Sequence, residues 1–414
     1  MANLLYLVHR LPYPPNKGDK VRSYHLLKHL AARHSVYLAT FVDDPDDEQH
    51  LPVLHGLCAG LLAVPLLPSR AKIRSLASLM TGEPLSLGYY RDGALKRWIA
   101  GVRKQHTIDA TVVFSSAMAQ YAPIAHEQDG EPVLVDFVDV DSEKWAQYAT
   151  QRRWPQSWIY AREGRTLLSY ERALATRATR SFFVTEKEAA MFRRLAPECG
   201  GNVEAIGNGV DSDFFSPDPQ RRSPFQPGDA PIVFTGAMDY WPNIDAVTWF
   251  VAEVLPVLRA RQPSVRFIVV GRSPPVEIQA LASDSVIVTG TVPDVRPYLQ
   301  YAAVVVAPMR LARGVQNKIL EAMAMARPVV AAAECVEAID AESGEGLQAA
   351  SCGADYVRAI EQLLDHPNNA EAVGQRARAC VVRSYSWDAH LAAIDKFLPV
   401  VRADDSVTYS ATAA

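Results

Sequence analysis

The sequence has few cysteines and no long hydrophobic run, and both absences narrow what the protein can be. Its five cysteines are odd in number, widely spaced and form no CxxC pair. This excludes a disulfide framework or a zinc cage built on such pairs and fits a reducing cytoplasm. The first apolar run, Leu4–Val8, is too short for a signal-peptide core, and no later stretch approaches the roughly 20 apolar residues of a membrane span. We expect any contact with a membrane to be made at its surface.

The sequence also lacks a strong net charge and the two commonest nucleotide-binding fingerprints. Lys and Arg total 42 against 46 Asp and Glu, a formal net charge of −4, which argues against a general nucleic-acid binder. Neither HRLPYPPNKGDK nor TGAMDYW matches the GxGxxG of a dinucleotide-binding enzyme, and no Walker phosphate loop is found. A dinucleotide dehydrogenase is therefore excluded, and a nucleotide site must be sought in other residues.

The chain is long enough for two domains, because 414 residues with 49% hydrophobic content can form two separate cores. Buried-strand patterns alternate with helical ones in both halves, which predicts two doubly wound α/β domains. Turn-forming residues at Val203–Pro219 predict the join. We expect a first domain over 1–205, a second over 206–383, a last helix over 384–400 that packs back on the first, and a disordered tail over 401–414. The predicted strands are 3–8, 36–41, 61–64, 110–114 and 133–138 in the first half, and 231–235, 266–270, 286–289, 303–307 and 328–332 in the second.

The segment Arg310–Ala331, RLARGVQNKILEAMAMARPVVA, concentrates charge between two of these strands. Its middle is typical of the crossover helix of a βαβ unit that begins at Gly314. A helix N-terminus favours phosphate, and Arg310, Arg313 and Lys318 are predicted to surround it with full positive charges. Glu321 lies one turn after Lys318 and is predicted to accept hydrogen bonds from hydroxyls such as those of a ribose. The alternative is a surface ion pair at i, i+3 spacing, which contributes about 0.2–0.5 kcal/mol.

With these residues the chain resembles GT-B glycosyltransferases of the large retaining family that uses nucleotide sugars, the glycosyl transferases group 1 or family 4 type. The resemblance is carried, in this order, by PYPPNKGDKVRSYHLLKHL, IGNGVDSDFFSP, FTGAMDYWPNIDAVTWFVAEVLP, VTGTVPDVRPYL and GVQNKILEAMAMARPVV, and it spans essentially the whole chain. It implies a GT-B fold, in which two Rossmann-like domains face a cleft. It also implies transfer of a sugar from a nucleoside diphosphate to an acceptor hydroxyl with retention, without a metal or another cofactor.

The resemblance implies a role for several residues of the second domain. Glu321 matches the glutamate that binds the nucleotide ribose, and Lys318 is a candidate catalytic partner of the diphosphate. Arg272 follows a predicted strand directly and is placed to add a second cation. Gly290 and Val292 belong to the turn that receives the base through main-chain contacts. For Arg272 the alternative is a solvated cation at a strand end.

In the first domain, Gly18 and Asp19 match the glycine loop that approaches the donor phosphates and sugar, although Gly18 alone could serve only to permit a turn. Two positions depart from the family pattern. Arg313 stands where the family usually has a glutamate, eight positions before the ribose-binding one, so recognition of the donor sugar is expected to differ. Asp139 keeps the aspartate of a frequent His-Asp pair whose histidine is missing. Asp139 therefore remains a candidate acid/base or acceptor-binding group with Asp136 and Asp141, the alternative being strand-end and capping carboxylates.

Three other functions compete with this one. The DVD sequence at Asp139–Asp141 is also found in the metal-binding DxD motif of single-domain GT-A enzymes. A GT-B-type nucleotide-sugar 2-epimerase would act on one substrate without an acceptor, and a catalytically silent nucleotide-sugar sensor would need no chemistry at all.

In the GT-B glycosyltransferase interpretation, Lys318, Arg272 and the helix N-terminus replace a metal as the positive charge on the leaving diphosphate. The leaving phosphate itself then takes the acceptor proton.

The segment Arg70–Lys104 carries eight Lys or Arg against two acidic residues, interleaved with apolar side chains. Basic amphipathic stretches of this kind can lie on anionic membranes, although a solvated helix face explains many of them. RRWPQSW, at 152–158, adds a second basic and aromatic patch. The chain resembles bacterial exopolysaccharide transferases linked to exosortase-type sorting systems. This implies a cytoplasmic, peripherally membrane-bound enzyme that acts on a glycan or lipid-linked acceptor and binds no nucleic acid.

Overall fold

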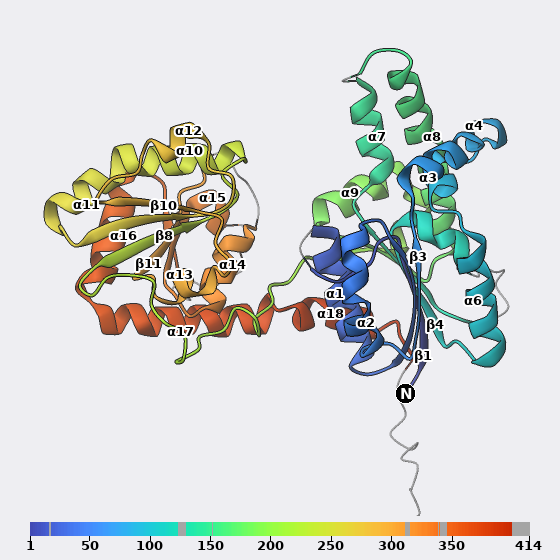
Figure 1. The fold of residues 1–414 in the computed structure, drawn as a ribbon, viewed down its shortest axis with the longest axis horizontal. Helices are drawn as coiled ribbons and strands as arrows, with labels where there is room; N and C mark the ends of the chain where they lie inside the picture. The colour runs from blue at the N-terminus through green and yellow to red at the C-terminus, as the bar shows by residue number, and fades with distance from the viewer. Residues whose placement is uncertain are drawn as a thin grey trace, which may run out of the picture. The chain divides into compact units, whose positions relative to one another are not determined.

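The structure is a computed structural model of the chain, and it describes residues 1–15, 18–122, 130–150, 152–310, 315–337, 339 and 346–399. The chain divides into two compact units (Figure 1). The first unit contains Met1–Asn208 and the residues from His390 on, and the second contains Gly209–Ala389. The predicted tail over 401–414 lies outside the described residues.

The first unit is built on a seven-stranded, fully parallel sheet with the order β3-β2-β1-β4-β5-β6-β7. The central strands are almost entirely apolar and buried, as expected where helices cover both faces of a sheet. Five of the strands were predicted with bounds that agree within one residue, and the short strand β7 at the expected join is also present. β6 was not predicted. The strands are β1 (Asn3–Val8), β2 (Ser35–Val42), β3 (Gly60–Pro65), β4 (Ala110–Phe114), β5 (Val133–Val138), β6 (Arg180–Phe183) and β7 (Val203–Ala205).

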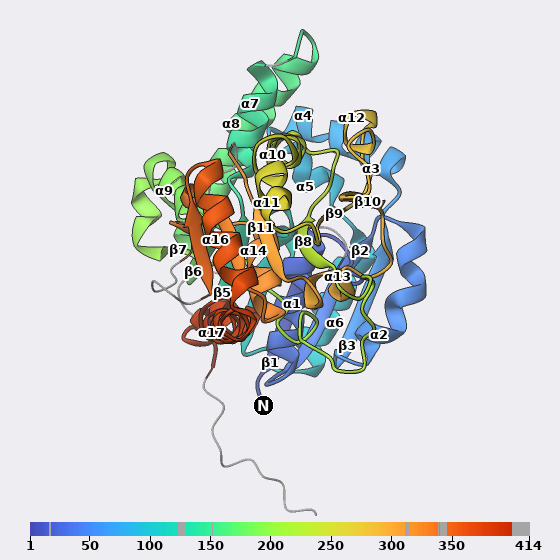
Figure 2. The ribbon, with the colours of Figure 1, turned by 90° about the vertical axis from the view of Figure 1, so that its left-hand side faces the viewer.

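Two helices of the first unit, α7 and α8, form a hairpin that extends away from the sheet (Figures 1 and 2). α8 is tied to the short helices α4 and α5 by two buried side chains. Arg162 donates to the Ser78 carbonyl at 2.7 Å, and Glu163 accepts from the Leu85 backbone N–H at 2.6 Å. The helices are α1 (Gly18–Ala31), α2 (Leu51–His55), α3 (Pro68–Leu76), α4 (Ser78–Thr81), α5 (Leu85–Tyr89), α6 (Gly93–Gln105), α7 (Asp141–Thr150), α8 (Gln156–Arg177) and α9 (Glu186–Leu195).

The second unit has a six-stranded parallel sheet with the order β10-β9-β8-β11-β12-β13. The predicted strands are all present, and β13 is an addition. The strands are β8 (Ala230–Thr235), β9 (Val265–Val270), β10 (Val286–Gly290), β11 (Val304–Ala307), β12 (Val329–Ala332) and β13 (Leu347–Ala350). The helices are α10 (Trp241–Trp249), which continues through a π-helical turn into α11 (Leu255–Arg261), α12 (Val276–Gln279), α13 (Arg296–Gln300), α14 (Asn317–Ala324), α15 (Ala333–Val336), α16 (Gly353–Asp365) and α17 (Pro367–Ser384).

Two predicted helices differ from the observed ones. α14 begins at Asn317 instead of Gly314, because Gln316 still has an extended backbone, with φ −103° and ψ 118°, which is typical of the residue before a helix. Of the helix predicted over 384–400, the described residues are helical at Ser384, where α17 ends, and over Trp387–Asp395, as α18, since the Ser386 hydroxyl accepts the Ala389 N–H and starts a new helix there. Within the described ranges, no helix is long and apolar enough to cross a membrane.

Candidate active site

A cavity of about 670 Å³ opens in the second unit, where strands β8 and β9 end and helix α14 begins. One wall is formed by the last residue of each strand and the two that follow it, Thr235–Ala237 and Val270–Arg272, and the beginning of α14 forms another. The carboxyl edge of a parallel sheet is where open α/β folds bind ligands. The volume lies within the about 300–1,000 Å³ that small-molecule sites occupy.

Two glycines leave the backbone bare at this edge. A Cβ atom on Gly271 would lie 1.6 Å from the Gly236 carbonyl oxygen, and one on Gly236 would lie 2.7 Å from Nδ2 of Asn243. Neither position can carry a side chain without a shift of the backbone or of Asn243. The two loops therefore meet closely and expose main chain to whatever fills the cavity.

Lys318 lies in the first turn of α14 and is held by a residue that the sequence did not reveal, Asn243. Its Nζ donates to Asn243 Oδ1 at 2.6 Å and lies 4.3 Å from the centre of the Phe234 ring. The Asn243 amide in turn donates to the Ala237 carbonyl at 2.8 Å. Burial lowers the pKa of Lys318 to about 8, although the neighbouring Glu321 opposes the shift. Lys318 therefore changes its charge close to physiological pH.

Glu321 lines the same cavity one turn further along α14. Burial raises the pKa of this carboxyl to about 7, and the charge of Lys318 opposes the shift. A carboxylate and an ammonium group thus share one partly buried pocket. The structure brings together these two predicted residues, and perturbed titrating groups in a cavity are typical of functional sites.

The other predicted residues of the second unit have different surroundings, and only some of them line the cavity. Arg272 and Val292 line the cavity, and the mostly exposed Arg272 guanidinium lies 4.0 Å from Asp239. Gly290 ends β10 with φ +69°, a backbone conformation that favours glycine. Arg310, at the start of the charged segment, instead forms an ion pair with Asp245 at 2.5 Å. Arg313 and Gly314 lie outside the described residues.

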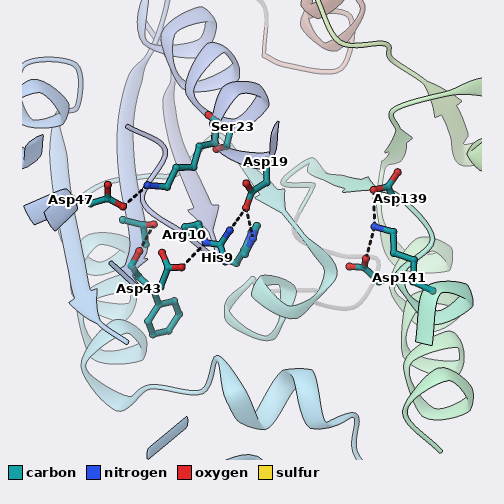
Figure 3. Close-up of polar contacts among 12 residues, drawn as sticks. His9, Arg10, Asp19, Ser23, Asp43, Asp47, Asp139 and Asp141 are labelled. Atoms are coloured by element: carbon teal, nitrogen blue, oxygen red, sulfur yellow. Dashed lines mark hydrogen bonds and ion pairs between the residues drawn. The ribbon is translucent and has the colours of Figure 1, made fainter. Parts of the chain in front are cut away.

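In the first unit, Gly18 and Asp19 form the beginning of α1, and Asp19 belongs to a chain of charges (Figure 3). Arg10 donates to Asp19 at 2.7 Å and forms an ion pair with Asp43 at 2.8 Å, and His9 Nε2 lies 3.5 Å from Asp19. Although burial opposes the shift, the interaction with His9 and the charge of Arg10 hold the pKa of Asp19 well below its usual range. Asp19 is therefore ionised and already paired with a cation.

The three aspartates near the end of β5 have different partners. Asp136 is buried and accepts a hydrogen bond from Arg22 Nε at 2.7 Å, so it holds the fold together, as the structural alternative proposed. Asp139 and Asp141 both accept from Lys144 Nζ, at 2.7 and 3.2 Å (Figure 3). Burial raises the pKa of Asp141. Only Asp139 and Asp141 remain as candidate site residues here.

The comparison with protein families decides what the second unit is. Residues 230–366 match the family model described as glycosyl transferases group 1, and this stretch contains the cavity residues from Thr235 to Glu321. Residues 230–366 form a glycosyl transferases group 1 domain. The predicted family is therefore confirmed for this part of the chain, whereas no curated protein matches the sequence.

Solved structures extend the likeness to almost the whole chain. HepE from Anabaena, solved with UDP, is 16% identical with a TM-score of 0.59 and covers 96% of this chain and 99% of its own. Sucrose-phosphate synthase from Thermosynechococcus elongatus is 20% identical with a TM-score of 0.58, over 96% and 98%. A glycosyltransferase from Rickettsia africae is 14% identical with a TM-score of 0.58, over 96% and 97%. These matches confirm the predicted GT-B fold with two parallel α/β sheets.

Proposed function

We propose that the protein transfers a sugar from a nucleoside diphosphate sugar to a hydroxyl of a glycan acceptor, with retention at the anomeric carbon. The observation that carries the proposal is the convergence of Lys318, Arg272 and Glu321 on one cavity of the glycosyl transferases group 1 domain. Two cations and a hydroxyl-binding carboxylate at the end of a parallel sheet match the charges of a nucleoside diphosphate. The solved complexes of HepE with UDP and with UDP-glucose make UDP-sugars the first donors to try.

In this proposal each cavity residue has one task. Lys318 and Arg272 neutralise the diphosphate, which can approach the bare backbone at Gly236 and Gly271. Glu321 accepts the ribose hydroxyls. Val292, in the turn that follows β10, lines the side of the cavity proposed for the base.

The chemical step needs no metal or other cofactor in this proposal. The bond between the anomeric carbon and the diphosphate oxygen breaks while the acceptor oxygen bonds to the same face of the sugar. The diphosphate oxygen takes the acceptor proton, and the two cations stabilise the charge that develops on the leaving group. Donor selection is assigned to Arg313, which replaces a glutamate of the family pattern, and Asp139 is kept as an acceptor-side group.

The proposed setting is the synthesis of a bacterial exopolysaccharide on a lipid-linked acceptor at the inner face of the membrane. Within Arg70–Lys104, the exposed side chains support the proposed membrane contact for α3 and α4 better than for α6. Leu95 and Ile99 of α6 are buried in the core of the first unit, so that helix does not present its apolar side to lipid. The exposed apolar side chains are on α3 and α4, and more follow on the α7–α8 hairpin: Ile73, Leu76 and Met80, then Tyr148, Trp154 and Trp158.

Incubation with UDP-, GDP- and ADP-sugars, with and without EDTA, tests the proposal. We expect one donor to be consumed, and to yield a glycoside with the anomeric configuration of the donor when the acceptor is present. NMR of the product distinguishes retention from inversion. Formation of an epimer without an acceptor would identify the protein as an epimerase, and binding of a donor without any turnover would identify it as a sensor.

A further inference from the structure

A second, smaller pocket lies entirely within the first unit, at the carboxyl ends of β1, β4 and β5. It encloses about 230 Å³. His9 follows β1, Ser115 and Ser116 follow β4, and Asp141 and Lys144 come from the beginning of α7 after β5. Since this volume is below the about 300–1,000 Å³ of sites for drug-sized ligands, it fits one ring rather than a nucleotide.

The backbone is strained at two of the strand ends that form this pocket. Ser115 has φ +75° and Val138 has φ +68°, in the left-handed region that residues other than glycine rarely adopt. The pairing of β5 with β6 also shifts its register between Asp136 and Val138. Such strain persists where the surroundings require the conformation, often at functional sites. Here it turns Ser115 into the pocket and directs the chain after β5 toward Asp141.

The lining combines hydrogen-bonding groups with aromatic rings. Asp141, Lys144 and the two serines supply acceptors and donors, while Tyr90, Trp145 and Tyr148 supply ring faces. A sugar ring has this same division, because its hydroxyls lie around the edge and its C–H groups form apolar faces that pack on aromatic rings. Trp145 is held edge-on to Tyr148 at 6.0 Å and against Tyr160 at 5.1 Å, so its ring is fixed before any ligand binds.

The charges of the pocket argue against an anionic ligand. Among the described residues that line it, Lys144 supplies the one ammonium group, which already bonds both Asp139 and Asp141, so this cluster carries more negative than positive charge. On the other wall, His9 lies beside the ionised Asp19. A phosphate or a uronic acid would therefore meet no spare cation among the described lining residues, whereas the hydroxyls of a neutral sugar can donate to Asp141.

We infer that this pocket binds the terminal sugar ring of the acceptor, and that this ring is neutral. The inference rests on the proposed glycosyl transfer and makes it more specific. Asp141 accepts a hydroxyl of the ring, Trp145 and Tyr90 pack on its faces, and Lys144 keeps Asp139 and Asp141 in place. The enzyme then extends a glycan that already carries a neutral sugar, and a lipid phosphate without a sugar is not its acceptor.

Binding and transfer are both needed to test this inference. Saturation-transfer NMR of the full chain with methyl glycosides of glucose, galactose and mannose should detect at least one of them, and methyl glucuronide should bind more weakly. Trp145→Ala and Asp141→Asn should each weaken that binding at least tenfold. Asp46→Asn, the same change at an exposed carboxylate of the first unit, should not.

With a donor identified, the same variants should lose transfer to the glycoside while hydrolysis of the donor continues at its original rate. Transfer to a polyprenyl phosphate or a glucuronide in preference to every neutral glycoside would overturn the inference, as would unchanged glycoside binding in Trp145→Ala. Failure of the proposed function is distinguishable, because it would abolish turnover of every donor and leave glycoside binding measurable.

Discussion

Lys318 and Asn243 are 75 positions apart in the sequence, yet the lysine ammonium donates to the asparagine side chain at 2.6 Å. The Nδ2 amide of Asn243 donates to the carbonyl of Ala237, which lies in the loop after β8. This loop therefore determines where the lysine ammonium lies. The lysine that we assign to the diphosphate is therefore positioned by a residue from another part of the domain. This contact has consequences for rate that can be measured.

Asn243→Ala should reduce kcat by up to about 100-fold, because the ammonium loses the bond that directs it and small misplacements of a catalytic group are costly. Asn243→Asp keeps an acceptor and adds a negative charge, which should raise the pKa of Lys318 and move the alkaline limb of the pH–rate profile upward. Steady-state kinetics with the identified donor measures both. Unchanged kcat in a folded Asn243→Ala variant would show that the bond does not position Lys318 for the reaction.

Lys318→Ala should lower kcat by about 10²–10³-fold, the loss expected when one group that stabilises developing negative charge is removed. The variant should stay folded, since it removes a buried charge that burial itself disfavours. Lys187→Ala, on an exposed position of α9, is the matched control. Circular dichroism checks that the variant is folded, and donor turnover measures the loss of kcat. Near-normal turnover would remove Lys318 from the mechanism.

The pH dependence of kcat/KM should be bell-shaped, with limbs near pH 7 and pH 8. Glu321 has a raised pKa of about 7, so it loses its charge as the pH falls through 7. Lys318 has a lowered pKa of about 8, so it loses its charge as the pH rises through 8. Glu321→Gln should abolish the acidic limb and move the alkaline limb to lower pH, because the carboxylate that raises the pKa of Lys318 is gone. An acidic limb that persists in Glu321→Gln belongs to another group.

Local patterns in the sequence predicted most of the fold because the buried parallel strands are continuous apolar runs. β11 (Val304–Ala307) shows this clearly. β6 and β13 were missed since each has only four residues and contains polar or small ones, RSFF and LQAA. Such segments become strands because a neighbouring strand offers an edge, as β12 does for β13. That information is in the tertiary structure and not in the segment.

The site residues show the same difference between what a local segment predicts and what only the tertiary structure reveals. Lys318 and Glu321 could be paired from the sequence because they are three positions apart on one helix, where spacing predicts proximity. Asn243 could not, since its contact with Lys318 joins separate elements. The only local signal is a polar residue, in WPN, that is buried in the first turn of α10. For Asp136 the sequence left a functional and a structural role open, and the structure favours the structural one because its buried partner, Arg22, is 114 positions away.

Arg22→Ala should lower the free energy of unfolding of the first unit by about 3–5 kcal/mol, because it leaves the buried Asp136 carboxylate without its cation. Arg22 also donates to the Ile206 carbonyl at 2.8 Å and to Asn208 at 3.0 Å, so the end of the first unit's main segment loses two anchors. Urea denaturation measures the change. The double variant Arg22→Met with Asp136→Leu should recover part of the loss, since no charge is then left unpaired. Equal losses in the single and double variants would show that the contacts to Ile206 and Asn208 dominate.

The exposed apolar side chains of α3, α4 and the α7–α8 hairpin should bind anionic lipid. Met80 is 92% exposed and follows α3, which carries Arg70, Lys72 and Arg74, while Trp154 is 81% exposed and directly follows Arg152 and Arg153. Side chains of this kind insert at the headgroup boundary while Lys and Arg contact anionic lipid. The protein should sediment with vesicles that contain phosphatidylglycerol and less with vesicles of phosphatidylcholine. Met80→Ser with Trp154→Ala should weaken sedimentation several-fold, whereas Val276→Ser, at an exposed apolar residue of the second unit, should leave it unchanged. If the double variant sediments like the original protein, these helices are not the membrane-binding surface.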